Sequence, residues 1–277
     1  MYRVSKVLNN NGVIAIDMDE NQEYVILGKG VGFGKKVSQR FDKPQECTMY
    51  RLAQETKRGS AKELVKGIEP EYLEIADAIL TEAQKVFGDS IDRGILFPLA
   101  DHISFAVARI RRNEQISNPL TEDIKVLFYS EFKVAETLKT ILKERLQIEI
   151  DDHEVGYVAL HIHSAIGDEK VSVAMQIARA VRECIDMIEK ATGKPIDVLS
   201  LSYNRLMNHM KYMVARASTG EKLNLDMNEY MLDQYPQAYE IAADICKNLE
   251  GCIGHKLDET EIGYLAMHIQ RVYKDAV

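Results

Sequence analysis

The sequence lacks any hydrophobic segment that would cross or enter a membrane. No apolar run approaches the ~20 residues that a membrane-spanning helix needs. The first residues, MYRVSKVLNNNG, contain no apolar stretch of the kind found in secretory signal peptides. We therefore expect a cytoplasmic protein without membrane insertion. The composition, 46% hydrophobic and 28% charged, is typical of a globular protein.

Cysteine is scarce, and its spacing excludes two kinds of site. The chain has 4 cysteines, and no two of them form a CxxC pair. This argues against a zinc ribbon and against thioredoxin-like redox chemistry. We expect reduced, mostly packed thiols, and neither a metal ion nor a cofactor.

Basic residues are outnumbered, which at first argues against nucleic-acid binding. The chain has 35 Lys and Arg against 43 Asp and Glu, a formal net charge of -8. The charge is uneven, however, because residues 1–58 carry 10 basic and 7 acidic side chains and the remainder carries 25 and 36. Residues 1–58 thus carry a net charge of +3, and the remainder carries -11. This asymmetry favours nucleic-acid binding by residues 1–58, called the head below, in front of an acidic remainder.

Hydrophobic periodicity changes along the chain at the same place. Segments 13–16 and 24–27 are short, β-branched and bounded by Asn, Asp and Gly, so residues 1–58 are predicted to form four or five strands and no helix. From about residue 69 the apolar residues recur at helical spacing. Residues 59–65 have no strong apolar face and are predicted to be a linker.

The helical part of the chain is an internal repeat. The segment EVGYVALHI at 154–162 matches EIGYLAMHI at 261–269 in six of nine positions, at an offset of 107. The same offset aligns His102 with His209 and His161 with His268. We expect two homologous all-α helical-bundle domains, at 66–170 and 171–277, behind a small all-β domain.

The paired histidines admit several roles. His161 and His163 cannot share a metal ion on a helix, because residues two apart point about 200° from each other. No GxSxG motif accompanies the histidines, which argues against nucleophilic hydrolysis. A neutral imidazole can instead accept a phosphoryl group, whose charge then orders or breaks an interface. A shared structural hydrogen bond in each copy stays open as the other interpretation. His153, His163 and His255 have no counterpart in the other copy.

Carboxylates accompany these histidines in the sequence. Glu154, Tyr157 and His161 lie at spacings that share one helix face, and the second copy repeats this pattern. Asp101 precedes His102, whereas an asparagine precedes His209. A carboxylate beside an imidazole favours its charged form and can fix its tautomer. We hypothesise that the two copies respond differently to the same modification for this reason.

Two segments of the head have the chemistry of an RNA reader. They are KVLNNNG at 6–12 and GKGVGFGKK at 28–36. Asparagine amides can read base edges, glycines allow close backbone approach, Phe33 can stack on a base, and lysines can meet phosphates. The first segment is also a plausible turn, and the second contains the letters of a dinucleotide fingerprint. No amphipathic helix follows it, so the dinucleotide interpretation fails. A strand domain of this size has a marginal core, which dimerisation would relieve.

This order of motifs resembles the BglG/LicT-type bacterial transcriptional antiterminators across essentially the whole chain. The resemblance implies a co-antiterminator RNA-binding domain that forms a symmetric β dimer, followed by two regulation domains of the sugar phosphotransferase system (PTS), called PRDs. It also implies that the homodimer binds a leader-mRNA hairpin of a sugar-utilisation operon and prevents terminator formation.

The resemblance implies roles for particular residues. The implied phosphorylation sites are His102, His161, His209 and His268. The implied RNA contacts are Lys6, Asn9, Asn11, Gly28, Lys29, Gly30 and Phe33. Some family members have Arg at position 29, and Lys offers only a point charge there. The implied phosphoryl donors are the carrier HPr and a sugar-specific permease, enzyme II, so the protein would be a substrate of phosphoryl transfer and not an enzyme.

Two other functions remain as alternatives. One is a PRD-type regulator of the same architecture that acts on DNA or lacks RNA binding. The other is a cytosolic metal or phosphoryl-transfer enzyme that uses the repeated histidines. Comparing hairpin RNA with duplex DNA in a gel shift separates the first from an antiterminator, and metal analysis addresses the second.

Overall fold

The computed structural model describes residues 1–52, 65, 67–166, 171–193, 195–197 and 200–275. The predicted linker at 59–65 lies almost entirely outside these described residues. The chain forms two compact units, of which the first comprises Met1–Ser117 and Ser130–Glu169 and the second comprises Asn118–Tyr129 and Lys170–Val277. Each unit is described by itself below.

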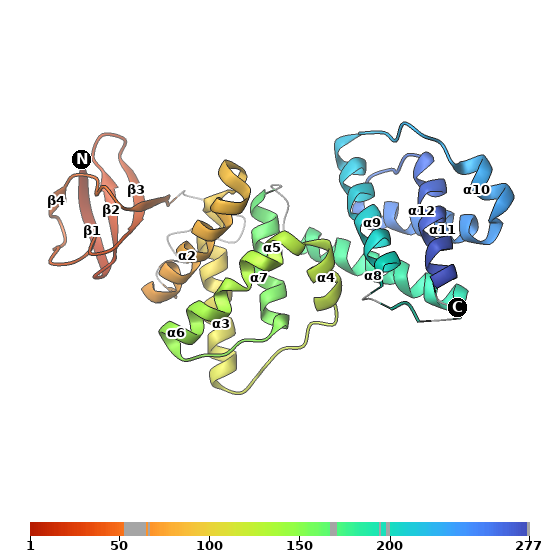
Figure 1. Cartoon of the computed structure of the whole chain (residues 1–277). Coiled ribbons are helices and arrows are strands. Elements are labelled where there is room, and N and C mark those ends of the chain that lie inside the picture. The colour runs from red at the N-terminus through yellow and green to blue at the C-terminus, as the bar shows by residue number, and fades with distance from the viewer. Residues whose placement is uncertain (53–64, 66, 167–170, 194, 198–199, 276–277) are drawn as a thin grey trace. The chain divides into compact units, whose positions relative to one another are not determined.

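The first unit begins with a five-stranded antiparallel sheet, which confirms the predicted β head (Figure 1). Its strands are β1 (Tyr2–Asn9), β2 (Gly12–Asp17), β3 (Gln22–Leu27), β4 (Arg40–Phe41) and β5 (Thr48–Arg51). They lie in the order β4-β1-β2-β3-β5. Val13, Ala15 and Ile26 are fully buried and pack with Val31 from the segment after β3. This core is small, as expected for a domain of fewer than 60 residues.

Helices form the rest of the first unit. They are α2 (Pro70–Phe87), the short 3-10 turns η1 (Gly88–Ser90) and η2 (Arg93–Ile95), α3 (Leu96–Arg111), α5 (Tyr129–Ala135), α6 (Thr137–Leu146) and α7 (Asp152–Ile166). Helix α2 begins at Pro70, whose fixed φ suits a first helical position, and ends at Gly88 with φ 64°. The predicted helical periodicity is confirmed here, because Tyr72, Ile75 and Ile79 are buried.

The described part of the second unit contains helices and loops but no strand. It contains α4 (Thr121–Leu127), α8 (Val171–Thr192), α9 (Leu201–Thr219), α10 (Asn228–Gln234), α11 (Pro236–Ile253) and α12 (Thr260–Asp275). The Ser200 side chain accepts a hydrogen bond from the Tyr203 amide and so caps α9, and Gly220 at φ 73° ends this helix.

The offset of 107 holds for the helices themselves. It carries α4 onto α10, and it carries residues 129–146, which form α5 and α6, onto α11. The repeat even keeps the position that ends this segment, because Gln147 and Gly254 both adopt a left-handed conformation, at φ 56° and 71°. Glycine adopts such a conformation without strain, whereas glutamine does not. The duplication read from the sequence is therefore a duplication of structure.

Helix α4 departs from the repeat in its packing. Its counterpart α10 packs against α11 and α12, whereas α4 packs against α8 and α9 of the second unit. Ile124 and Leu127 are buried there, and so is Asp123, whose Oδ1 accepts a hydrogen bond from the Tyr203 hydroxyl at 3.1 Å. A helix that belongs to the first repeat in sequence is thus part of the second unit in space.

Within the described residues, no helix combines the length and the apolar character needed to cross a membrane.

Candidate functional site

The first histidine pair lies where α3 and α7 pack together. The ring centroids of His102 on α3 and His161 on α7 are 5.3 Å apart. The Tyr157 ring, one turn before His161, lies 5.8 Å from the His102 ring. The predicted grouping of Glu154, Tyr157 and His161 on one helix face is confirmed, and the structure adds that this face meets His102.

A buried carboxylate and an arginine complete this first site. Glu154 is only 4% exposed, and its Oε2 lies 3.5 Å from Nε2 of His102. Its Oε1 accepts a hydrogen bond of 2.8 Å from Arg109 Nη2. Burial opposes ionisation of Glu154, but the contacts with His102 and Arg109 outweigh it and lower the pKa of this carboxyl. Glu154 is therefore an anion at neutral pH.

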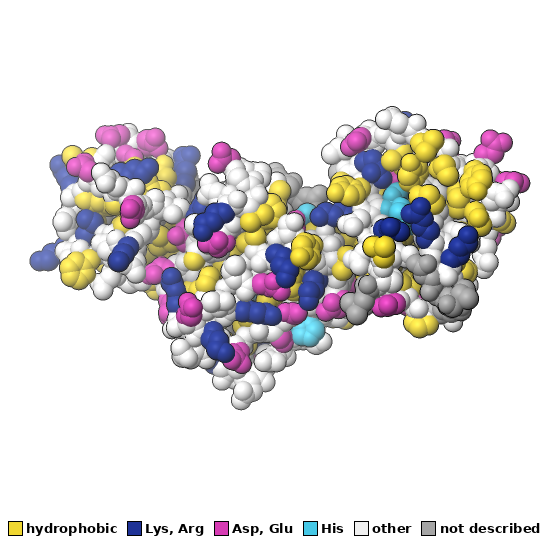
Figure 2. All heavy atoms as spheres, viewed as in Figure 1, with side chains coloured by type: hydrophobic (Ala, Val, Ile, Leu, Met, Phe, Trp, Pro, Cys, Tyr) yellow, Lys and Arg dark blue, Asp and Glu magenta, His cyan; other side chains and the backbone are white. Residues whose placement is uncertain are grey.

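The second copy repeats this arrangement with closer histidine rings and a tighter arginine–glutamate pair. The rings of His209 on α9 and His268 on α12 stack, with centroids 4.8 Å apart. Glu261 Oε2 lies 3.7 Å from His209 Nε2. Arg216 binds Glu261 with two hydrogen bonds, from Nε at 2.6 Å and from Nη2 at 2.9 Å. On the visible face of this unit, Figure 2 shows hydrophobic and basic side chains gathered around a histidine.

Burial keeps the second pair of imidazoles neutral. Burial, with smaller effects of His268 and Arg216, lowers the pKa of His209 to about 3. Burial, followed by the charges of Arg271 and Arg205, lowers the pKa of His268 to about 4. A neutral imidazole has one ring nitrogen with a free lone pair, which a nucleophile requires.

The carboxylate beside the first imidazole is not the one suggested by the sequence. Asp101 is adjacent to His102 in the chain, but the carboxylate at ion-pair distance is Glu154 from another helix. Glu261 supplies the same group in the second copy. The difference between the copies therefore lies in burial and in arginine pairing, not in the presence of a carboxylate.

Sequence reasoning missed both arginines. Arg109 and Arg216 each lie seven residues, or two helical turns, after a candidate histidine, and they are related by the offset of 107. That coincidence was a usable signal. The identity of their partner was not, because Glu154 and Glu261 lie 45 residues away along the chain.

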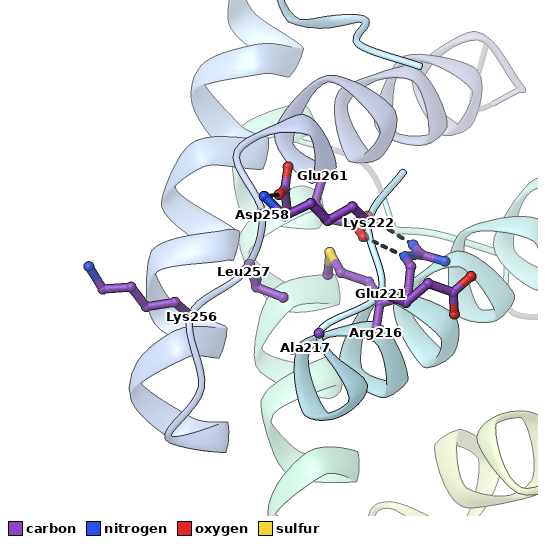
Figure 3. Close-up of a pocket in the computed structure, with 10 residues that line it drawn as sticks. Arg216, Ala217, Glu221, Lys222, Lys256, Leu257, Asp258 and Glu261 are labelled. Carbon is purple, nitrogen blue, oxygen red and sulfur yellow. Dashed lines mark hydrogen bonds and ion pairs between the residues drawn. The ribbon is translucent and has the colours of Figure 1, made fainter. Parts of the chain in front are cut away.

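A cavity of about 170 Å³ opens beside the second site (Figure 3). Its lining includes the Arg216–Glu261 pair and, from the loops that follow α9 and α11, Lys222 and Asp258. Lys222 Nζ lies 3.1 Å from Asp258 Oδ2. Hydrogen bonds from the Thr260 hydroxyl and amide, aided by Lys222, lower the pKa of Asp258 to about 2. Two of the charge pairs that line the cavity, Arg216–Glu261 and Lys222–Asp258, are thus already formed.

His163, one of the three histidines without a counterpart, has a carboxylate partner of its own. Its Nδ1 is 2.9 Å from Oε1 of the buried Glu131. Within the described residues, no group of three or more His, Cys, Asp or Glu side chains is arranged to hold a metal ion.

The two polar segments of the head form one surface. The amide of Gly28 donates to the Asn11 carbonyl, and the amide of Gly32 donates to the Asn10 carbonyl, both at 2.9 Å. The amide of Gly30 donates to Asn11 Oδ1 at 3.0 Å. A Cβ at position 32 would lie 2.0 Å from the Asn9 carbonyl oxygen, so only glycine fits. Asn9, Asn11, Gly28 and Gly30 are therefore brought together.

The remaining candidate RNA contacts surround this surface differently. Phe33 is 74% exposed on the same glycine-rich segment, and Lys29 is exposed as well. Lys6 is exposed on β1, where it pairs with Ile14 of β2. An exposed phenylalanine contributes nothing to the core of its own domain, and its position suits stacking on an unpaired base.

The asparagine amides of this surface are occupied by a carboxylate. Asn9 Nδ2 donates to Glu74 Oε1 at 2.6 Å, and Asn11 Nδ2 donates to Glu74 Oε2 at 3.2 Å. Glu74 belongs to α2 of the same unit. Any ligand that reads these two amides has to replace Glu74.

The fold and its sites define a regulatory architecture: a small β domain that joins a duplicated helical domain with a His–Glu–Arg cluster in each copy. Comparison with known families agrees with this description. Residues 2–58 match the CAT RNA binding domain, and residues 77–165 and 182–272 each match the PRD domain. The chain therefore belongs to the family of proteins that combine a CAT RNA-binding domain with two PRDs.

Curated relatives share this architecture over nearly their full length. The "GlcA/glcB genes antiterminator" of Staphylococcus carnosus is 30% identical over 274 residues, which cover 97% of this chain and 94% of the relative. The "Transcription antiterminator LicT" of Bacillus subtilis is 28% identical over 278 residues, which cover 99% and 100%. A crystal structure of GlcT CAT-PRDI superposes with a TM-score of 0.52 at 28% identity, covering 60% of this chain and 98% of that one.

Proposed function

We propose that this protein is an RNA-binding transcriptional antiterminator of a sugar-utilisation operon. Its homodimer binds a hairpin in the leader mRNA and prevents terminator formation, and the PTS controls its activity. The observation that carries the proposal is the His–Glu–Arg cluster, present in both PRDs of a chain that begins with a CAT domain. The curated relatives named as antiterminators support it. The protein acts in the cytoplasm, where PTS carriers and nascent transcripts meet.

The PRDs receive phosphoryl groups in this proposal, and no reaction is catalysed on another substrate. The acceptors are His102 and His161 in the first copy and His209 and His268 in the second. A sugar-specific enzyme II phosphorylates the first PRD and inactivates the protein, whereas HPr phosphorylates the second and activates it. The charge added at these helix-packed sites biases the arrangement of the dimer and so reaches the RNA-binding head.

The RNA-binding surface comprises Lys6, Asn9, Asn11, Gly28, Lys29, Gly30 and Phe33. Its test is a gel shift with leader-hairpin RNA against duplex DNA of the same sequence. Asn9→Ala and Phe33→Ala should each abolish hairpin binding. Asn9→Ala removes an amide that can read a base edge, and Phe33→Ala removes a base–aromatic stack, which contributes about 1–3 kcal/mol per base. Glu74→Ala should tighten binding, because it frees the two amide donors. Raising the salt concentration should weaken binding steeply through lost lysine–phosphate contacts.

The controls separate this function from its alternatives. Circular dichroism should show that Phe33→Ala keeps the fold, since the side chain is exposed. Equal affinity for duplex DNA would favour the DNA-binding alternative. Unchanged RNA affinity in all three variants would remove this surface from RNA recognition.

A further inference from the structure

The two ring nitrogens of the candidate histidines have unequal surroundings. In His102 and His209 the nitrogen that is buried without a hydrogen-bond partner is Nε2. In His268 it is Nδ1. All three histidines lie in the described part of the chain. Their rings are therefore turned differently, with Nε2 buried in His102 and His209 and Nδ1 buried in His268. A phosphoryl group can be accepted on either nitrogen, and the orientation of the ring decides which one a donor can reach.

The buried Nε2 atoms face a carboxylate in both copies. Glu154 Oε2 lies 3.5 Å from Nε2 of His102, and Glu261 Oε2 lies 3.7 Å from Nε2 of His209. An ionised carboxylate only accepts hydrogen bonds, so it favours the tautomer that carries its proton on Nε2. The lone pair of the neutral ring then resides on Nδ1. Arg109 and Arg216 hold the carboxylates in this position.

The same geometry excludes reaction at Nε2. A separation of 3.5 or 3.7 Å is a single non-bonded contact, with no space for another group between the two atoms. A phosphoryl group on Nε2 would press two anions together in a buried site, where like charges repel strongly. The His102 side chain is 18% exposed although its Nε2 is buried, so a donor meets the other part of the ring.

We propose that His102 and His209 accept the phosphoryl group on Nδ1, that His268 accepts it on Nε2, and that Glu154 and Glu261 are the positioning residues that select Nδ1. This inference rests on the proposed function, because it assigns the acceptor atoms of that phosphorylation. The second PRD would then carry both phosphohistidine isomers, one on each ring of a stacked pair.

The transfer balances without any further reactant. The Nδ1 lone pair forms the new P–N bond while the P–N bond of the donor phosphohistidine breaks. The electron pair of the broken bond stays on the donor imidazole. The accepting ring keeps its proton on Nε2 and becomes a cation, which faces the Glu154 or Glu261 carboxylate.

The test determines which nitrogen carries phosphorus. Full-length protein labelled with ¹⁵N-histidine is prepared in versions that keep His102 alone, His209 alone or His268 alone of the four candidates. The His209 and His268 versions are phosphorylated by HPr with its phosphoenolpyruvate-dependent enzyme, and all three versions are also phosphorylated by phosphoramidate, a small phosphoryl donor. ³¹P–¹⁵N correlation spectra should show Nδ1-phosphohistidine for His102 and His209 and Nε2-phosphohistidine for His268. Nε2-phosphohistidine at His209 would overturn the assignment.

The two donors separate failure of this inference from failure of the proposed function. If HPr transfers nothing but phosphoramidate gives the expected isomers, the nitrogen assignment stands and the PTS donor is wrong. If HPr transfers to the opposite nitrogens, the proposed function stands and the assignment is wrong. If neither donor labels any of the histidines, both are wrong.

Substitution of the carboxylate tests its positioning role. Glu261→Gln can donate a hydrogen bond to Nε2, which releases the preference for the Nε2–H tautomer. Phosphorylation of His209 on Nδ1 should slow by about 10- to 100-fold. Metal-binding histidines show a loss of this size when the carboxylate that holds their other ring nitrogen is removed. Nε2-phosphohistidine should also appear. Glu261→Asp keeps the charge and should restore Nδ1 selectivity. Glu240→Gln, at an exposed position on α11, is the matched control. An unchanged isomer ratio in Glu261→Gln would contradict the role of Glu261.

Discussion

The two histidine sites contain equivalent residues but differ in the hydrogen bonding and the exposure of their arginine. Each places two imidazoles, a tyrosine, a buried glutamate and an arginine at equivalent positions of a duplicated bundle. In the second copy the arginine grips its glutamate with two hydrogen bonds and is 15% exposed. In the first copy the arginine makes one hydrogen bond and is 26% exposed.

This difference suggests how a duplicated domain acquires two roles. The two clusters contain the same residue types at equivalent positions. Access and rigidity are set by the surrounding packing, which can change without changing those residues. Under the proposed function, we expect the closed second site and the more open first site to suit different phosphoryl donors.

The largest expected effect comes from breaking the tighter ion pair. Arg216→Met leaves Glu261 as a buried, unpaired charge, which should lower the free energy of unfolding by about 3–5 kcal/mol. Arg109→Met should cost less, because Arg109 is more exposed and gives up a single hydrogen bond. Urea denaturation followed by circular dichroism measures both. The double variant Arg216→Met/Glu261→Met should recover most of the loss, and equal losses for the two arginines would remove the contrast between the sites.

The next effect is functional and has opposite sign in the two copies. His102→Ala should relieve inhibition, and His102→Asp should mimic the inhibited state. His209→Ala should lose activation. Each change should alter expression of an operon reporter by about 5- to 150-fold, the usual range of allosteric coupling. A reporter that responds in the same direction to His102→Ala and His209→Ala would mean that the copies have one role.

A smaller effect concerns the hydrogen bond between Tyr203 and Asp123, which the repeat does not duplicate. The Tyr203 hydroxyl donates to the buried Asp123. The offset of 107 relates Tyr203 to Leu96 and Asp123 to Tyr230, and these two residues cannot form the same hydrogen bond. Burial raises the pKa of Asp123, and the Tyr203 hydrogen bond partly offsets this. Tyr203→Phe should cost about 1–3 kcal/mol of unfolding free energy because Asp123 loses its donor. Tyr230→Phe, at an exposed position, should change stability very little.

The smallest expected effect is acid sensitivity of the second site. The folded state holds the pKa of His209 at about 3 and that of His268 at about 4, below the ordinary value of 6.5. The unfolded state therefore binds more protons, so stability falls as pH drops through 6.5, by about 1–2 kcal/mol between pH 7 and pH 6 for the two histidines together. Thermal unfolding at pH 7 and pH 6 checks this. His209→Gln/His268→Gln should remove that part of the pH dependence, and a loss of the same size in the double variant would assign it to other groups.

The sequence predicted the division into a β head and two helical copies because both signals are local or periodic. Strand-like runs, helical spacing and an offset of 107 are visible without coordinates, and they placed all four paired histidines. The partners of these histidines were harder to predict. Glu154 was placed on the correct face by its spacing, but Asp101 was the nearer carboxylate in sequence, and only packing of α3 on α7 decides between them.

Tertiary contacts also explain what the sequence did not predict in the head. The segments at 9–12 and 28–34 each suggested nucleic-acid binding, but their sequences do not indicate that the two segments lie in contact. The close approach of Gly32 to the Asn9 carbonyl becomes apparent only when the backbone positions are known. The carboxylate of Glu74 on the asparagine amides is a contact across more than 60 residues of chain, and no local pattern indicates it.

Because α4 packs in the second unit, neither repeat can be removed or exchanged as an independent domain. A fragment cut at the repeat boundary, 171–277, would lose the helix that covers α8 and α9, and would leave the Tyr203 hydroxyl without Asp123. A fragment that ends before residue 171 would carry Asp123, Ile124 and Leu127 without the surface that buries them. The second unit therefore includes a helix that belongs to the first repeat in sequence. Deleting or swapping either repeat would therefore damage its neighbour as well.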